Sequence, residues 1–150
     1  MISPTAHPKI LLVDDNHDGL LVRRTLLEEI GYIVEVAASG EEGLKRFASS
    51  GFDVVVTDYR MPRMNGAELI VRIREIDPNA RVILLSGFVD PLGLTEANTG
   101  ADVVLLKSSN EAAHLLRSVK RLLNRGAAVR KPAGAERGAP ARTSAMSRGA

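Results

Sequence analysis

Five polar residues of types that can take part in chemistry directly follow or end short apolar segments of the chain. A carboxylate in such a position loses hydration and needs compensation. Three carboxylates that lie close together repel one another, and a hard divalent cation such as Mg²⁺ can balance them while keeping several of its waters. A hydroxyl and an ammonium group nearby would complete a site suited to phosphoryl chemistry, which needs mainly positioning and charge neutralisation. The five residues are Asp14, Asp15, Asp58, Ser86 and Lys107.

The segments that must position these residues have the pattern of buried β-strands. Each is four to seven residues long and rich in Val, Ile and Leu. Three of them are almost continuously apolar, which favours a parallel sheet covered on both faces. The five segments are KILLVDD (9–15), YIVEVA (32–37), FDVVVTD (52–58), RVILLS (81–86) and DVVLLK (102–107).

Amphipathic helices are predicted between these strands. Gly31 is a stop signal after the first helix, and residues 39–42 read as a capping box that opens the second. Residues 91–100 contain proline and glycine and have poor periodicity, so we expect a short or irregular helix there. The apolar stripes are Leu20, Leu21, Leu27 and Ile30; Leu44 and Phe47; Leu69, Ile70, Ile73 and Ile76; and Leu115, Leu116, Val119, Leu122 and Leu123.

Five strand–helix units in succession predict an α/β fold with a doubly wound, five-stranded parallel sheet and right-handed crossovers. The flavodoxin-like strand order 2-1-3-4-5 is the leading choice, and it makes the first and third strands neighbours. Ligands bind such sheets beyond the carboxyl ends of the strands, where the strand order reverses. Asp14 and Asp15 follow the first strand and Asp58 ends the third, so the topology predicts that these carboxylates converge in one crevice.

Composition limits the class of protein. The 150 residues suggest one domain, and 45% hydrophobic residues fit a globular fold. Cysteine is absent, which excludes a disulfide framework and thiolate chemistry. The first residues lack a secretory signal pattern, and no apolar run reaches the roughly 18 residues that span a bilayer. We therefore expect a cytoplasmic protein that does not enter the membrane.

The charge distribution divides the chain. Residues 1–125 carry 15 Lys or Arg and 17 Asp or Glu, whereas residues 126–150 carry five basic residues and one Glu. The second segment consists mostly of Ala, Gly, Pro, Arg and Ser and cannot bury enough apolar surface to offset the entropy of ordering. We expect an N-terminal extension (1–8), a folded domain (9–125) and a disordered basic tail (126–150). The tail has no aromatic residue and no helix-turn-helix pattern, so direct nucleic-acid binding is not expected.

The ordered motifs resemble a receiver domain of the response regulators of bacterial two-component signalling. The matching segments cover residues 9–125 at compatible spacing. Any one of them is weak evidence, but together and in order they are specific. They are LLVDDN (11–16), VVVTDYRMPRMNG (54–66), LLSG (84–87), GAD (100–102) and LLK (105–107).

The resemblance implies a role for each matching residue. Asp58 would be the phosphoacceptor, and Lys107 and Ser86 would bind the phosphoryl oxygens. Mg²⁺ would be held by Asp15 directly, by Asp14 through a water, by Asp58 and by the backbone carbonyl of Arg60. The donor would be a phosphohistidine on a sensor histidine kinase or a phosphotransfer protein. We expect a single-domain response regulator, monomeric or weakly dimeric, that is not an enzyme beyond Mg²⁺-dependent self-phosphorylation and autodephosphorylation.

The chain departs from the family pattern in the segments expected to transmit the signal. Ser108 follows Lys107 where the family usually has proline in a cis peptide, and such a bond before a non-proline residue costs about 2.5–4 kcal/mol. Val104 stands where the family often has a switching aromatic residue. The segment between the fourth strand and the fourth helix is also one residue shorter than expected. The phosphorylation chemistry thus looks intact, while the readout looks unusual.

Other interpretations of the same residues remain open. Asp14 and Asp15 could form an ordinary turn, Ser86 could be a helix N-cap, and Lys107 could be a solvated strand end. An alternative function is a phosphate-independent protein-interaction module with the receiver fold, which the departures at Val104 and Ser108 favour. A small hydrolase with an aspartyl nucleophile is less compatible, since a dehalogenase-like phosphatase would need an Asp-x-Asp pair after the first strand.

Overall fold

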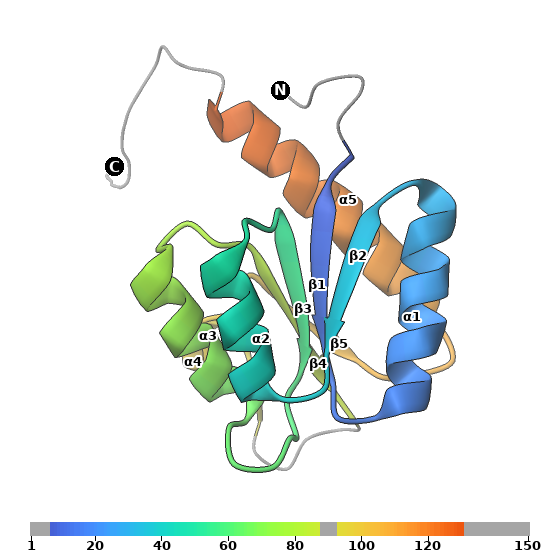
Figure 1. The fold of residues 1–150 in the computed structure, drawn as a ribbon. Helices are drawn as coiled ribbons and strands as arrows, with labels where there is room; N and C mark the ends of the chain where they lie inside the picture. Colours follow the sequence, from blue (N-terminus) through green and yellow to red (C-terminus); the bar gives the residue numbers. More distant parts are fainter. Residues whose placement is uncertain (1–6, 88–92, 131–150) are drawn as a thin grey trace.

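A parallel sheet with helices on both faces forms the fold (Figure 1). The computed structural model describes residues 7–87 and 93–130. The strands are β1 (Lys9–Val13), β2 (Ile33–Ala37), β3 (Val54–Asp58), β4 (Val82–Ser86) and β5 (Val103–Leu106). The helices are α1 (His17–Ile30), α2 (Gly40–Ser49), α3 (Gly66–Ile76), α4 (Glu96–Thr99) and α5 (Glu111–Arg130).

The strand order is β2-β1-β3-β4-β5, and every pair is parallel. This confirms the predicted fold class and strand order. All five residues of β3 and of β4 are buried, as expected for central strands covered on both faces. The edge strand β5 is only partly buried, and Leu106 at its end is exposed.

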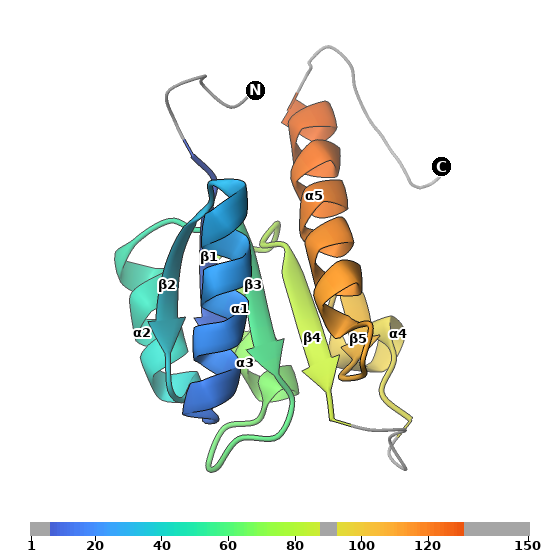
Figure 2. The same ribbon diagram turned by 90° about the vertical axis from the view of Figure 1, so that its right-hand side faces the viewer.

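Two apolar layers hold the helices against the sheet. On one face, α1 and α5 bury Leu20, Leu27, Leu115 and other side chains against alternate residues of the strands. On the opposite face, α2 and α3 bury Phe47, Leu69 and their neighbours against the remaining strand residues. Figure 2 shows α1 and α5 on the face turned toward the viewer. The period-2 alternation of strand side chains thus supplies both cores.

Capping residues mark the helix boundaries. Asn16 accepts a hydrogen bond from the backbone of Gly19 at the start of α1, and Gly31 ends that helix with φ of 110°. Ser39 caps α2 by accepting from the backbone N–H of Glu42. The predicted capping box is incomplete, because the Glu42 carboxylate accepts from the backbone N–H of Ala38 instead of Ser39. Ser39 is nevertheless the N-cap, and α2 begins at the next residue.

The buried stripe of α1 differs from the predicted one. Leu20 and Leu27 are buried as expected, but Leu21 is 59% exposed and Ile30 is 52% exposed. Arg23 occupies the inward position between Leu20 and Leu27 and is 8% exposed. Three- and four-residue steps from Leu20 lead through Arg23 to Leu27, so helical geometry places this arginine on the core-facing side. A search for apolar residues alone overlooked it.

The C-terminal third partly follows the predictions. The short α4, with four residues, agrees with the expected short helix. Helix α5 continues to Arg130, five residues beyond the boundary placed after residue 125, because Gly126 is followed by two alanines, the best helix formers. Residues 131–150 of the expected tail and 1–6 of the expected extension lie outside the described residues. Within the described ranges, α5 and the shorter helices all lack the combination of length and apolar character that a bilayer crossing requires.

Candidate functional site

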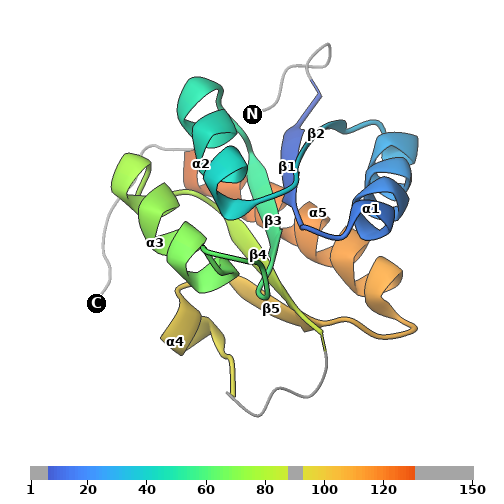
Figure 3. The same cartoon turned by 60° about the horizontal axis from the view of Figure 1, so that its bottom comes forward.

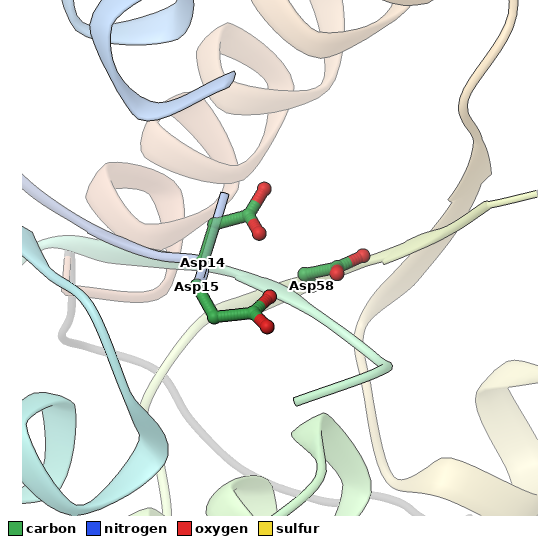
Figure 4. A group of neighbouring side chains, drawn as sticks. All are labelled: Asp14, Asp15 and Asp58. Atoms are coloured by element: carbon green, nitrogen blue, oxygen red, sulfur yellow. The ribbon is translucent and has the colours of Figure 1, made fainter. Parts of the chain in front are cut away.

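Three carboxylates meet at the carboxyl end of the sheet. Asp14 and Asp15 follow β1, and Asp58 is the last residue of β3. Each offers an oxygen, and these oxygens lie within 4.8 Å of one another. Figure 3 brings this end of the sheet forward, and Figure 4 shows the three side chains beside one another, with their carboxylates turned to the same side. The predicted convergence of the carboxylates is therefore present.

The strand register produces this convergence. Val13 pairs with Thr57 in the parallel ladder between β1 and β3, so the residue that follows each of them lies at the same level of the sheet. The backbone N–H of Asp14 donates to the carbonyl of Ala37 at 3.1 Å, which extends the ladder with β2 by one step. The backbone N–H of Asn16 donates to Oδ1 of Asp14 at 3.0 Å and fixes that carboxylate.

Lys107 makes the principal contact with Asp58. Its Nζ lies 2.8 Å from Oδ1 of Asp58 and 3.7 Å from Oδ2 of Asp14. The Lys107 side chain, which follows β5, thus reaches past the end of β4 to the end of β3. Lys107 is therefore not a solvated strand end, and it can act as a cation toward any group bound to Asp58.

Asp58 is ionised only at a cost. It is 6% exposed. Burial raises the pKa of its carboxyl above the ordinary value, and the neighbouring charge of Asp14 adds to the rise. The hydrogen bond and the charge of Lys107 lower the pKa and so oppose this rise. The charge of Arg23 also lowers the pKa of Asp58. A bound cation would thus relieve an unfavourable concentration of negative charge.

Arg23 belongs to the site, although the sequence analysis did not name it. Its Nη1 donates to Oδ2 of Asp14 at 2.9 Å. Its Nε and Nη2 donate to the two carboxylate oxygens of Glu111, at 2.6 and 3.2 Å. Arg23 and Glu111 lie on the inward stripes of α1 and α5. Charged residues at core-facing positions were the signal that could have identified them.

Ser86 and Arg60 both lie at the carboxyl end of the sheet. Ser86 is the buried last residue of β4, and its backbone carbonyl accepts from the N–H of Lys107 at 2.7 Å. Most of the residues that a helix capped by Ser86 would contain, from residue 88 onward, lie outside the described residues. Arg60 lies in the loop between β3 and α3. The described part of the chain contains no cis peptide bond, so the bond between Lys107 and Ser108 is trans.

The start of α3 is packed directly on the end of β3. Gly66 donates its N–H to the carbonyl of Tyr59 at 2.8 Å. A Cβ at Gly66 would lie 2.4 Å from the backbone oxygen of Asp58 and 2.6 Å from Cδ1 of Leu84. Only glycine permits this approach, which fixes the backbone that carries Asp58.

A cavity of about 430 Å³ opens beside the carboxylates and is lined by Asp15, Tyr59, Arg60 and three further residues of the β3–α3 loop. A larger cavity of about 550 Å³ lies at the opposite end of the sheet and includes Arg74 and Asp102. Those two side chains pair with each other at 3.1 Å. The smaller cavity is the one that adjoins the converging carboxylates, so volume does not identify the site here.

The donor set fits a hard divalent cation. Three carboxylates offer oxygen ligands, Asp15 is exposed and leaves room for water, and the adjoining cavity could receive an anionic ligand. Mg²⁺ prefers this combination of few carboxylates and several waters. The acidic cluster could therefore hold a metal ion.

The acidic pocket lies at the switch point of a doubly wound α/β sheet, which is where proteins of this fold class bind their ligands. Residues 10–120 match the family model of the response regulator receiver domain. The chain is 30% identical over 115 residues to the response regulator receiver protein CpdR of Brucella abortus, covering 77% of this chain and 96% of CpdR. This chain belongs to the response regulator receiver domain family.

Two further comparisons agree. The response regulator TrrA of Thermotoga maritima, solved in complex with Mg²⁺-BeF, superimposes with a TM-score of 0.70 at 35% identity, covering 77% of this chain and 99% of TrrA. A response regulator receiver protein of Anaeromyxobacter sp. is 38% identical over 81 residues, which are 54% of this chain and 34% of that protein. The chain thus matches only about a third of the length of that curated relative.

Proposed function

We propose that Asp58 accepts a phosphoryl group from a phosphohistidine of a sensor histidine kinase or a phosphotransfer protein. The contact of 2.8 Å between Lys107 and Asp58, beside two further carboxylates in a receiver fold, is the observation that carries this proposal. Asp58, as the proposed nucleophile, would thus have beside it a cation that can pair with the negative charge of the transferred group.

In the proposed transfer, an oxygen of Asp58 attacks the phosphorus in line with the bond to the leaving group. The P–N bond of phosphohistidine breaks, the imidazole takes the electron pair and then a proton, and Asp58 becomes an acyl phosphate. Lys107 keeps its ion pair as the negative charge moves to the phosphoryl oxygens, and Ser86 donates its hydroxyl to one of them. In the later hydrolysis, water attacks the phosphorus, the acyl O–P bond breaks, the Asp58 carboxylate is restored, and inorganic phosphate leaves.

We assign Mg²⁺ to the acidic cluster, with Asp15, Asp58 and the backbone carbonyl of Arg60 as direct ligands and Asp14 acting through a water. When bound, the ion would neutralise charge between the carboxylates and the phosphoryl oxygens. The relative TrrA was solved with Mg²⁺-BeF, which supports the assignment by analogy. Asp14 is the reasonable outer ligand, because Asn16 and Arg23 already occupy its oxygens.

The consequence of phosphorylation would be a change in partner binding. Receiver domains are phosphoacceptors and are not generally classed as enzymes, and we propose the same for this chain, apart from self-phosphorylation and autodephosphorylation. We place it in the cytoplasm, where ATP-dependent histidine kinases transfer their phosphoryl groups. We propose that this receiver domain is monomeric or weakly dimeric.

Intact-mass measurement tests the proposed phosphorylation. The protein is incubated with acetyl phosphate in the presence of Mg²⁺, beside a sample in EDTA and an Asp58→Asn variant. We expect a gain of one phosphoryl group that requires both Mg²⁺ and Asp58. Asp53→Asn is the matched control, since Asp53 precedes the same strand at its opposite end and should not affect the gain.

Failure of a folded sample to gain mass would overturn the proposal. It would favour the alternative of a phosphate-independent interaction module, in which the acidic cluster is at most a cation site. A gain that persists in Asp58→Asn would show that another residue is the acceptor.

A further inference from the structure

A buried arginine connects the acidic pocket to the start of α5. Arg23 has a side chain that is 9% exposed, and it bridges Asp14 of the pocket and Glu111 of α5, whose side chains are 3% and 16% exposed. The two helices lie side by side on one face of the sheet (Figure 3). Such an arrangement requires explanation, because burying an arginine and two carboxylates costs several kcal/mol per ion unless their geometry is excellent.

The geometry uses the planar fork of the guanidinium. Nε and Nη2 donate to the two carboxylate oxygens of Glu111, and Nη1 donates to Asp14. Burial alone would lower the pKa of Arg23, but the hydrogen bond and charge of Glu111, together with Asp14, outweigh it and raise the pKa, so the side chain stays charged. A lysine could not make these contacts together, since its ammonium is a single point charge.

Gly19 provides the space for this bridge. A Cβ at Gly19 would lie 2.9 Å from Nη1 of Arg23 and 3.3 Å from Oδ2 of Asp14. Gly19 is the third residue of α1, and glycine is a poorer helix former than alanine by up to about 1 kcal/mol. The sequence accepts that cost in the first turns of α1, at the position where the guanidinium reaches the pocket.

The oxygen that Arg23 holds is also exposed to the charges of the pocket. Oδ2 of Asp14 accepts from Arg23 at 2.9 Å and lies 3.7 Å from Nζ of Lys107. A divalent cation in the acidic cluster would attract the Asp14 carboxylate and repel the guanidinium of Arg23. Arg23 would then bind Glu111 more strongly. Glu111 offsets the positive charge of Arg23, so the pocket keeps its attraction for cations while Asp14 stays fixed.

We propose that Arg23 is a positioning residue that holds Asp14 and couples the occupancy of the acidic pocket to the start of α5 through Glu111. This inference rests on the proposed function, because it takes Mg²⁺ as the occupant. A change at the site could then reach α5 through Arg23 of α1, without an aromatic side chain at position 104.

Amide NMR spectra of the full ¹⁵N-labelled chain, recorded with and without MgCl₂, test the link. In the wild type we expect shifts at residues 14–16 and 58–60, which report the pocket, and at residues 111–115, which report the start of α5. In Arg23→Lys the pocket should still respond, while the response at 111–115 should be lost. The double variant Arg23→Met/Glu111→Met should behave in the same way, and it removes Glu111 together with Arg23 so that Glu111 is not left without its partner.

Arg24→Lys is the matched control, because Arg24 is the exposed neighbour that pairs with Glu28 on the same helix. It should reproduce the wild-type spectra. A wild-type response in the pocket without a response at 111–115, or a response at 111–115 that survives in both Arg23 variants, would overturn the link alone. Absence of any response at 14–16 and 58–60 would overturn the metal site and the link together.

Calorimetric titration with MgCl₂ gives a second readout. Glu111→Gln removes the charge that offsets Arg23, so we expect the Kd for Mg²⁺ to rise about tenfold, as is typical when an outer partner of a metal site is lost. Glu28→Gln controls for the loss of one negative charge elsewhere on the surface and should change Kd little. Equal Kd values in the wild type and Glu111→Gln would contradict the proposed charge balance.

Discussion

Asp58 combines burial with a proposed chemical role that requires it to be charged. Burial is the largest cause of its raised pKa, and the ion pair with Lys107 only partly compensates. The residue therefore opposes folding in the form that the proposed chemistry uses. Such conflicts between stability and chemistry are expected at functional sites.

This conflict predicts a stability change that depends on pH. Because the pKa of Asp58 is raised in the folded state, the folded protein binds a proton there more readily than the unfolded chain. The cost of ionising Asp58 is therefore present at neutral pH, is relieved as pH falls through the folded pKa, and is absent below the unfolded value. In EDTA near neutral pH, we expect Asp58→Asn to raise Tm by roughly 3 °C.

Circular dichroism melting curves over a pH series measure this effect. The difference in Tm between Asp58→Asn and the wild type should shrink as the pH approaches the ordinary pKa of an aspartate. A difference that is constant across the series, or a variant that is less stable at neutral pH, would show that the burial cost is not the dominant contribution.

Gly19 allows a test of the space occupied by Arg23. An alanine within a helix should stabilise the fold by up to about 1 kcal/mol over glycine. At Gly19 we expect no such gain, because the new Cβ would displace the guanidinium from Asp14. In the Arg23→Met/Glu111→Met background the gain should reappear. Urea unfolding measures both comparisons, and an equal gain in the two backgrounds would contradict the steric account.

At the scale of the elements, periodicity predicted the strands and the helix faces well. The central strands are buried throughout, and the strand order followed from five strand–helix units. The same periodicity failed at Arg23 and Glu111, because a charged residue on an inward stripe can be assigned only when its partner on another helix is known. Pairing between residues 88 positions apart is a property of the tertiary fold.

The close packing of α3 on the end of β3 also could not be predicted from the sequence. Gly66 belongs to the segment VVVTDYRMPRMNG (54–66) that matches the family, but its close approach to the backbone of Asp58 depends on how α3 packs on β3. We expect Gly66→Ala to lower the free energy of unfolding by about 2 kcal/mol, since a backbone oxygen cannot yield as a flexible side chain can. The displaced strand end should also slow phosphorylation by acetyl phosphate.

Gly51→Ala is the matched control for this prediction. A Cβ at Gly51 would meet no heavy atom within 4 Å, so its stability should change by less than about 0.5 kcal/mol. Urea unfolding of the two variants gives the comparison. Equal effects at Gly66 and Gly51 would show that the close packing around Gly66 does not stabilise the fold.

For the whole molecule, the sequence analysis predicted the sheet order, the meeting of Asp14, Asp15 and Asp58, and the family. It did not predict that the buried Arg23 pairs with Asp14, which also lies near Lys107. Nor did it predict the extension of α5 to Arg130. Backbone topology can be inferred from local patterns, whereas the partners of a buried charge depend on the packing of distant helices. The Arg23 bridge is a feature of this chain that membership in the family did not reveal.

The central claim is that Asp58, and neither of its neighbouring carboxylates, carries the phosphoryl group. Acetyl phosphate and Mg²⁺ are added, the acyl phosphate is reduced with borohydride to convert the acceptor aspartate to homoserine, and tryptic peptides are sequenced by mass spectrometry. Residues 47–60 form one tryptic peptide that contains Asp53 as an internal control, and residues 10–23 form another that contains Asp14 and Asp15. We predict homoserine at residue 58 alone. Homoserine at residue 14, 15 or 53, or none in a folded sample with Mg²⁺, would contradict the account.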